Sequence, residues 1–225
     1  MKKISILLLS ILLCVSGFPQ DPRVMDSLWT VIETTKTDTA RVQALVRLSF
    51  FETQPSLRLE LAFQALQLSK QIKWVVGEAL GYNQLSNIYR NIADYPNALD
   101  NALKALKIRE EIGSPEWIGV AFLNIGTIYG AQNRYEEAIT YYTKSEEYYR
   151  IAPTISAERR GVQYMSFGRA YILKGNYDSA LIYLNRAYEI IPKTSVNLPT
   201  IYIGLADVSL QTKILTWPSP IIKKL

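Results

Sequence analysis

Polar side chains that could contact a ligand gather in one short stretch of the chain. Asn83, Asn87, Arg90 and Asn91 are spaced by four, three and one residues, so in a helix they would share one face. An Asn side chain can pair with backbone amides, and an Arg side chain can grip a carboxylate. The row therefore suits an extended peptide. The alternative is an ordinary solvated helix face, since Asn and Arg are common exposed residues.

The chain offers little that could catalyse a reaction. It contains no His and a single Cys, Cys14, so Ser-His-Asp triads and Cys/His zinc sites are excluded. The pairs Glu136–Glu137 and Glu146–Glu147 fall toward opposite ends of one expected helix, without a Gly-rich phosphate loop nearby, and indicate a solvated face. We expect no enzyme activity, no metal and no cofactor. An all-α enzyme is the less favoured alternative.

The N-terminus differs in composition from the rest of the chain. Two lysines precede an apolar run of roughly twelve residues, which is too short for a bilayer span of about 20 residues. We predict a signal peptide over 1–20, cleaved between Ser16 and Gln20, and therefore export to the periplasm or the medium. A lipid on Cys14 is disfavoured because Leu13 precedes it where a small residue is needed.

The charge balance gives little support for nucleic-acid binding. The chain has 25 Lys and Arg against 20 Asp and Glu. Removal of Lys2 and Lys3 with the signal peptide leaves 23 against 20, a surplus of 3. There is no cluster of five or more basic residues, so a mixed, solvated surface is expected.

A block of residues that recurs three times predicts the elements that hold these polar groups. Its copies lie 40 and 42 residues apart with unchanged internal offsets. Periods of this length are typical of stacked supersecondary units. The first copy is Tyr82, Leu85, Ser86, Tyr89, Tyr95, Ala98 and Ala105; the second is Phe122, Ile125, Gly126, Tyr129, Tyr135, Ala138 and Ser145; the third is Tyr164, Phe167, Gly168, Tyr171, Tyr177, Ala180 and Ala187.

Each copy has the spacing of two amphipathic helices joined by a turn. Apolar residues at i, i+3, i+4 and i+7 give one face of the first helix, and steps of three and four give the inward face of the second, on which Tyr142 falls. We expect Gly126 and Gly168 to allow paired helices to approach closely. Tyr89 and its equivalents are expected in the core rather than as a stacking platform for bases or sugars.

These residues resemble the tetratricopeptide repeat family, whose pattern has a period of about 34 residues. The first two copies lack the proline that closes the family pattern. Their period is longer than that of the family, which predicts an extended second helix and a longer connection between hairpins. The resemblance covers about residues 55–210. It implies an all-α fold, a right-handed α-α superhelix (solenoid) of stacked helix hairpins. The copy that matches nearly throughout contains Tyr164, Phe167, Gly168, Tyr171, Ala180, Leu184, Ala187 and Pro192.

The domain organisation follows from the repeats. We expect a tetratricopeptide-repeat solenoid over 21–212, with a short amphipathic helix over 22–36 covering the open end of its core. Its expected repeats are a degenerate one at about 40–75, three at about 79–112, 119–152 and 161–192, and a partial one at 198–212.

The C-terminal residues 213–225 break the pattern and are expected to be irregular. Pro218 and Pro220 fall where a second helix should form, and each would cost about 3 kcal/mol inside a helix. A one-base shift of the reading frame at Lys213 permits codons for another second helix, with an Ala in register with Ala180. Our hypothesis is a frameshifted or truncated front portion of a longer repeat protein, and a non-functional remnant is the alternative.

The resemblance also implies where a ligand lies. Family members bind on the concave face, through inward positions of the first helices, as non-catalytic protein- or peptide-binding scaffolds. Together with the signal peptide, the repeats resemble the N-terminal periplasmic region of bacterial repeat-containing sensor proteins, in which a membrane helix and an output domain follow. Membrane contact would then come only from a downstream segment. The implied contact positions are Asn83, Asn87, Arg90 and Asn91, then Leu123 and Thr127, then Met165 and Arg169.

Overall fold

Residues 22–212, which the computed structural model describes, form ten α-helices and no strand. The expected all-α fold is thus confirmed. The chain divides into two compact units, Met1–Gln84 and Leu85–Leu225, and the boundary falls inside one helix. The expected signal peptide and the irregular tail at 213–225 lie outside the described residues.

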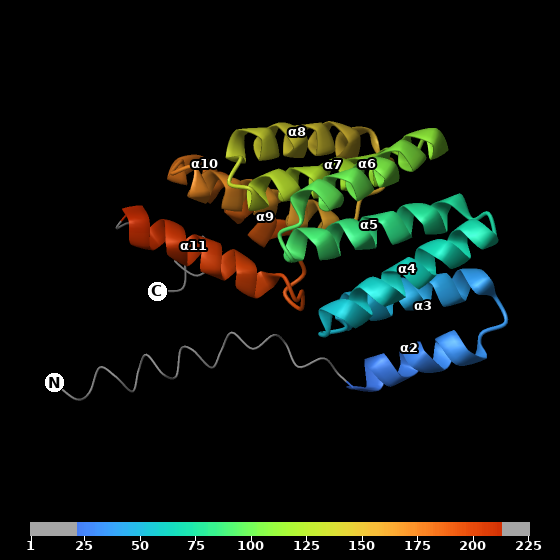
Figure 1. The fold of residues 1–225 in the computed structure, drawn as a ribbon. Coiled ribbons are helices and arrows are strands. Elements are labelled where there is room, and N and C mark those ends of the chain that lie inside the picture. The colour runs from blue at the N-terminus through green and yellow to red at the C-terminus, as the bar shows by residue number, and fades with distance from the viewer. Residues whose placement is uncertain (1–21, 213–225) are drawn as a thin grey trace, which may run out of the picture. The chain divides into compact units, whose positions relative to one another are not determined.

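The first unit begins with a helix that packs on the hairpin after it (Figure 1). Leu28 of this first helix joins one apolar cluster with Val42 and Leu45. Arg41 ties the two elements further, because its Nε donates to the carbonyl oxygen of Ile32 at 3.1 Å. The helices of this unit are α2 (Pro22–Thr34), α3 (Asp38–Phe51), α4 (Pro55–Gln71) and the first part of α5 (Val75–Asn91).

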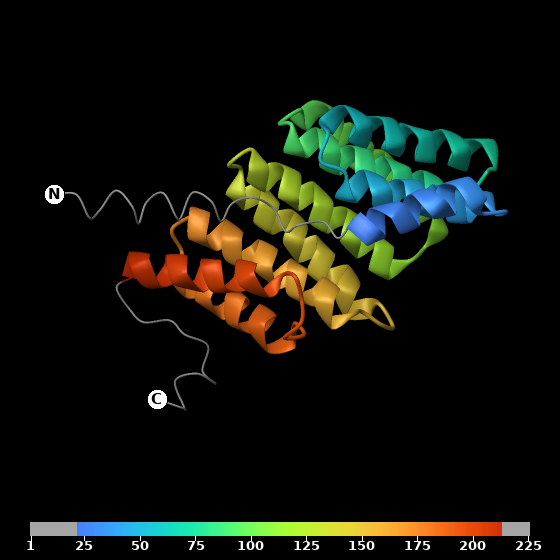
Figure 2. The same cartoon turned by 90° about the horizontal axis from the view of Figure 1, so that it is seen from below.

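The second unit contains the end of α5 and the six helices that follow. Helices α7 and α8 form one hairpin and α9 and α10 the next, while α11 packs against both α9 and α10 (Figure 2). The six helices are α6 (Tyr95–Ile112), α7 (Pro115–Ala131), α8 (Tyr135–Ile151), α9 (Ala157–Leu173), α10 (Tyr177–Ile190) and α11 (Leu198–Thr212).

The first helix of each hairpin in this unit ends in the same way. At the end of α5 the N–H of Asp94 donates to the carbonyl oxygen of Tyr89 at 2.8 Å, and Ala93 has a φ of 60°. This is the Schellman arrangement, in which one residue adopts the left-handed conformation. Asn133 (φ 62°) and Gly175 (φ 79°) occupy the same place after α7 and α9. The repeat therefore extends to the backbone geometry of its turns.

Small residues bring the paired helices together, as the repeat predicts. Gly126 of α7 packs against Tyr142 of α8, and Gly168 of α9 against Leu184 of α10. A further pair of positions was not anticipated. Gly119 contacts Tyr149 in the same manner, and at positions 42 residues later Gly161 of α9 contacts Ile191, the residue that follows α10. The alanines expected in the second helices, Ala98, Ala138 and Ala180, are each 0% exposed.

Candidate functional site

A groove of about 890 Å³ lies within the second unit. Its lining comes mainly from the C-terminal halves of α5, α7 and α9 and from α11, with Tyr135 and Tyr142 contributed by α8 and Leu184 by α10. We call this feature the groove. Its polar and charged lining residues are Arg90, Asn91, Thr127, Tyr135, Tyr142, Ser166, Arg169, Asn197, Thr200 and Asp207.

Four of the six site residues expected from the sequence line the groove: Arg90, Asn91, Thr127 and Arg169. Asn87 is half-buried and does not line it. Asn83 belongs to the first unit, where it is also half-buried. The structure therefore gathers groove-lining polar groups from three first helices, α5, α7 and α9, rather than from a row along α5 alone.

One further inward position was assigned incorrectly. Leu123 was expected to face the ligand, but it is 6% exposed and belongs to an apolar cluster with Tyr142 and Phe167. A Leu side chain gains more by filling the space between two hairpins than by facing water. Met165, which follows 42 residues later, does line the groove.

Arg90 is the most constrained charged group of the groove. Its Nη2 donates to Oδ1 of Asn91 at 3.1 Å, while its Nε is buried and has no hydrogen-bond partner among residues 22–212. Burial lowers the pKa of Arg90, and the nearby charge of Arg169 acts in the same direction. A buried donor without an acceptor costs about 1–3 kcal/mol. Arg90 is thus poised to donate to an anionic group.

The Tyr142 hydroxyl lies beside both arginines. Burial raises the pKa of Tyr142 to about 12, and the charges of Arg90 and Arg169 oppose that rise. The phenol therefore stays protonated at neutral pH and can donate a hydrogen bond. The sequence placed Tyr142 on the inward face of α8 as a packing residue. Its polar end adds a donor to the groove that the repeat pattern does not reveal.

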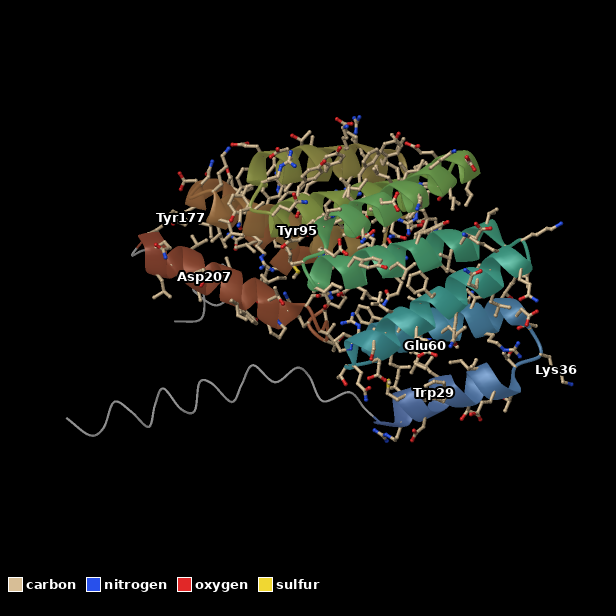
Figure 3. The ribbon with its side chains drawn as sticks, in the orientation of Figure 1. Trp29, Lys36, Glu60, Tyr95, Tyr177 and Asp207 are labelled. Atoms are coloured by element: carbon tan, nitrogen blue, oxygen red, sulfur yellow. The ribbon has the colours of Figure 1, made fainter. Side chains whose placement is uncertain are left out.

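Helix α11 supplies the other side of the groove through Thr200, Ile203 and Asp207. Figure 3 labels Asp207 on this helix, where its side chain is exposed. Asp207 was not among the site residues expected from the sequence, although the repeat carries a signal for it. Phe167 and Gly168 align with Leu205 and Ala206, so Asp207 occupies the repeat position of Arg169.

The connection before α11 is held in place by one carboxylate. Oε1 of Glu158, in the first turn of α9, accepts from Oγ of Ser195 at 2.6 Å and from Nδ2 of Asn197 at 2.5 Å. Hydrogen bonds to an ionised acceptor are stronger than neutral ones. Asn197 also lines the groove, so Glu158 fixes the point at which α11 enters the site.

The described part of the chain holds no group of three or more His, Cys, Asp or Glu side chains arranged to bind a metal ion. Within residues 22–212, every helix is too short or too polar to cross a membrane.

Comparisons with known proteins agree with the repeat analysis. Two sequence profiles, each described as Tetratricopeptide repeat, match residues 77–151 and 164–194. Among solved structures, the crystal structure of BtubC (BKLC) from P. vanneervenii is similar with a TM-score of 0.68, at 20% identity, over 90% of this chain and 88% of that chain. At this identity the likeness concerns the fold alone. No match was found among curated proteins.

Proposed function

This chain belongs to the tetratricopeptide repeat family, and from that premise we propose that its second unit binds an extended segment of a partner protein in the groove. The repeats indicate a protein-interaction scaffold, and such repeats are typically non-catalytic. The observation that carries the more specific proposal is the meeting of Arg90, Asn91, Thr127 and Arg169 in one groove.

The dimensions of the groove suit a short extended segment. Helix α9 contacts both α7 and α11, and packed helix axes lie about 8–10 Å apart. The three helices therefore span roughly 20 Å, which corresponds to about six residues of extended chain at about 3.3 Å each. Main-chain amides of such a segment can pair with Asn91, Thr127 and Asn197, while a carboxylate binds the arginines.

A hexapeptide library tests this proposal. Fluorescein-labelled hexapeptides with randomised positions are screened against the purified protein by fluorescence polarisation. We expect a selected sequence that binds the unaltered protein and loses at least tenfold in affinity on Arg169→Ala. Arg134→Ala is the matched control, because Arg134 is half-exposed, pairs with Glu137 and lies outside the groove. A library without any selective binder, or equal losses in both variants, would contradict the proposal.

We also propose that the protein is exported and that its repeats form the sensory or interaction part of a longer signalling protein. Two N-terminal lysines followed by a short apolar run support export. The test is cell fractionation with a C-terminal epitope tag. Leu8→Arg, which interrupts the apolar run, should retain the protein in the cytoplasm, whereas Ser5→Ala should not. Equal cytoplasmic retention of the unaltered protein would contradict export.

A further inference from the structure

The charges that line the groove are unevenly distributed. Arg90 and Arg169 come from α5 and α9, and the acidic lining residue among the described residues is Asp207 on α11. The positive charge of Arg169 is close enough to Arg90 to disfavour the charge of Arg90. Their mutual repulsion, together with the buried Nε of Arg90, favours an anionic group at this end of the groove.

Asp207 favours a cationic ligand group at the other end of the groove. Its side chain is exposed, and it forms no ion pair within residues 22–212. Asp207 and Arg169 occupy the same repeat position on adjacent helices. Neighbouring helix axes are about 8–10 Å apart, so the two ligand charges would be separated by about two to three extended residues.

Apolar side chains lie one helical turn before two of these charges, Arg169 on α9 and Asp207 on α11. Met165 of α9 and Ile203 of α11 line the groove and share a repeat position of their own. Ile203 is 63% exposed, so an apolar ligand side chain placed on it would remove apolar surface from water. The groove thus offers a cationic end and an anionic end, with apolar side chains one helical turn away from Arg169 and Asp207.

We infer that the groove selects a dipolar peptide segment, in which a carboxylate binds Arg90 and Arg169, an apolar side chain covers Ile203, and a Lys or Arg side chain binds Asp207. This inference rests on the proposed function and adds the charge pattern of the ligand. The carboxylate can belong to an Asp or Glu side chain or to a chain terminus, and both sources present the same acceptor atoms.

Four synthetic hexapeptides test this selection. The first two are Ala-Glu-Leu-Leu-Lys-Ala and its reverse-order counterpart Ala-Lys-Leu-Leu-Glu-Ala, both amidated at the C-terminus. The third replaces Lys by norleucine in whichever order binds better. The fourth replaces Glu by Ala and leaves the C-terminal carboxylate free. We expect at least one of the two orders to bind, and its affinity to fall as NaCl concentration rises. The fourth peptide separates a terminal carboxylate from a side-chain one.

The decisive measurement is a double-mutant cycle, in which binding affinities are compared after changing Asp207 in the protein, Lys in the peptide, or both. Asp207→Asn should weaken binding of the Lys peptide about tenfold or more, since a charged hydrogen bond is lost, and should leave the norleucine peptide unchanged. Asp207→Lys should in turn favour a peptide with Glu in place of Lys. Asp178→Asn, an exposed carboxylate on α10 outside the groove, is the control, and circular dichroism verifies the fold of every variant.

The possible failures are distinguishable. If peptides bind through Arg169 but Asp207→Asn weakens the Lys and norleucine peptides equally, the dipolar inference is overturned and the peptide-binding function stands. If none of the library peptides or the four hexapeptides binds, both are overturned.

Discussion

Tyr142 packs so closely against Gly126 that no larger residue fits between α7 and α8. A Cβ atom added to Gly126 would lie 2.5 Å from Cε1 of the Tyr142 ring and 3.0 Å from the carbonyl oxygen of Ala138. Tyr142 is 4% exposed and its hydroxyl end reaches the groove. The contact therefore sets both the approach of two helices and the position of a candidate binding group.

Gly126→Ala should destabilise the protein. Alanine gains about 1 kcal/mol in intrinsic helix propensity, but the overpacking against Tyr142 and the backbone costs about 1–3 kcal/mol. We expect a net loss of about 1 kcal/mol in the free energy of unfolding, measured by urea denaturation. Gly130→Ala, on the same helix, is the control, because its Cβ would lie at an ordinary 3.4 Å from the Tyr142 hydroxyl. Equal effects of the two substitutions would refute the packing argument.

Ala93→Gly should stabilise the protein. Ala93 adopts a φ of 60°, where the equivalent residue after α9 is Gly175. A residue with a Cβ atom pays about 1–2 kcal/mol to adopt the left-handed conformation, and Gly avoids this cost. Gly is also more flexible in the unfolded chain, which offsets about 0.5–1 kcal/mol of that gain. A gain of about 0.5 kcal/mol in the free energy of unfolding is expected. Ala152→Gly, at a φ of −68°, should instead lose stability, and a gain there would contradict the reasoning.

Arg90→Met should raise stability while abolishing ligand binding. The substitution removes a guanidinium whose buried Nε has no acceptor in the described structure and keeps the apolar stem. The hydrogen bond that is lost, from Nη2 to Asn91, is an exposed one. We expect the free energy of unfolding to rise by about 1 kcal/mol, as at other sites where function opposes stability. Arg169→Met, at an exposed position, should change stability by less than about 0.5 kcal/mol. Thermal melts followed by circular dichroism test this, and a destabilised Arg90→Met variant would contradict it.

Alkaline pH should destabilise the protein through two buried tyrosines. Burial raises the pKa of Tyr142 and that of Tyr149 to about 12 each, whereas an unfolded Tyr titrates near 10. The unfolded chain therefore releases these protons first, so the stabilisation present below pH 10 is lost as pH rises from 10 to 12. Tyr142→Phe should flatten this decline and remove one late-titrating phenol from the absorbance at 295 nm. An unchanged slope would show that Tyr142 ionises as in the unfolded chain.

The sequence alone determined the helix hairpins, because each hairpin is specified by contacts between residues close in the chain. Gly126 meets Tyr142 only 16 residues away, and Gly168 meets Leu184 at the same separation. Helical periodicity and the need to bury large side chains next to small ones are visible in such short stretches. The repeat register also extended to Asp207 on α11, where it could have identified a groove residue in advance.

Only the tertiary structure decided which polar groups meet. Arg90 and Arg169 are 79 residues apart in the chain, and the Tyr142 hydroxyl joins them from a second helix. Leu123, expected at the same inward position as Met165, instead lies in the core. Asn87, expected at the position of Thr127 and Arg169, does not line the groove. Repeated residue types specify the contacts within a hairpin. The rotation of each helix about its own axis, and the offset between stacked hairpins, follow from side-chain packing across the whole unit and decide which side chains reach the groove.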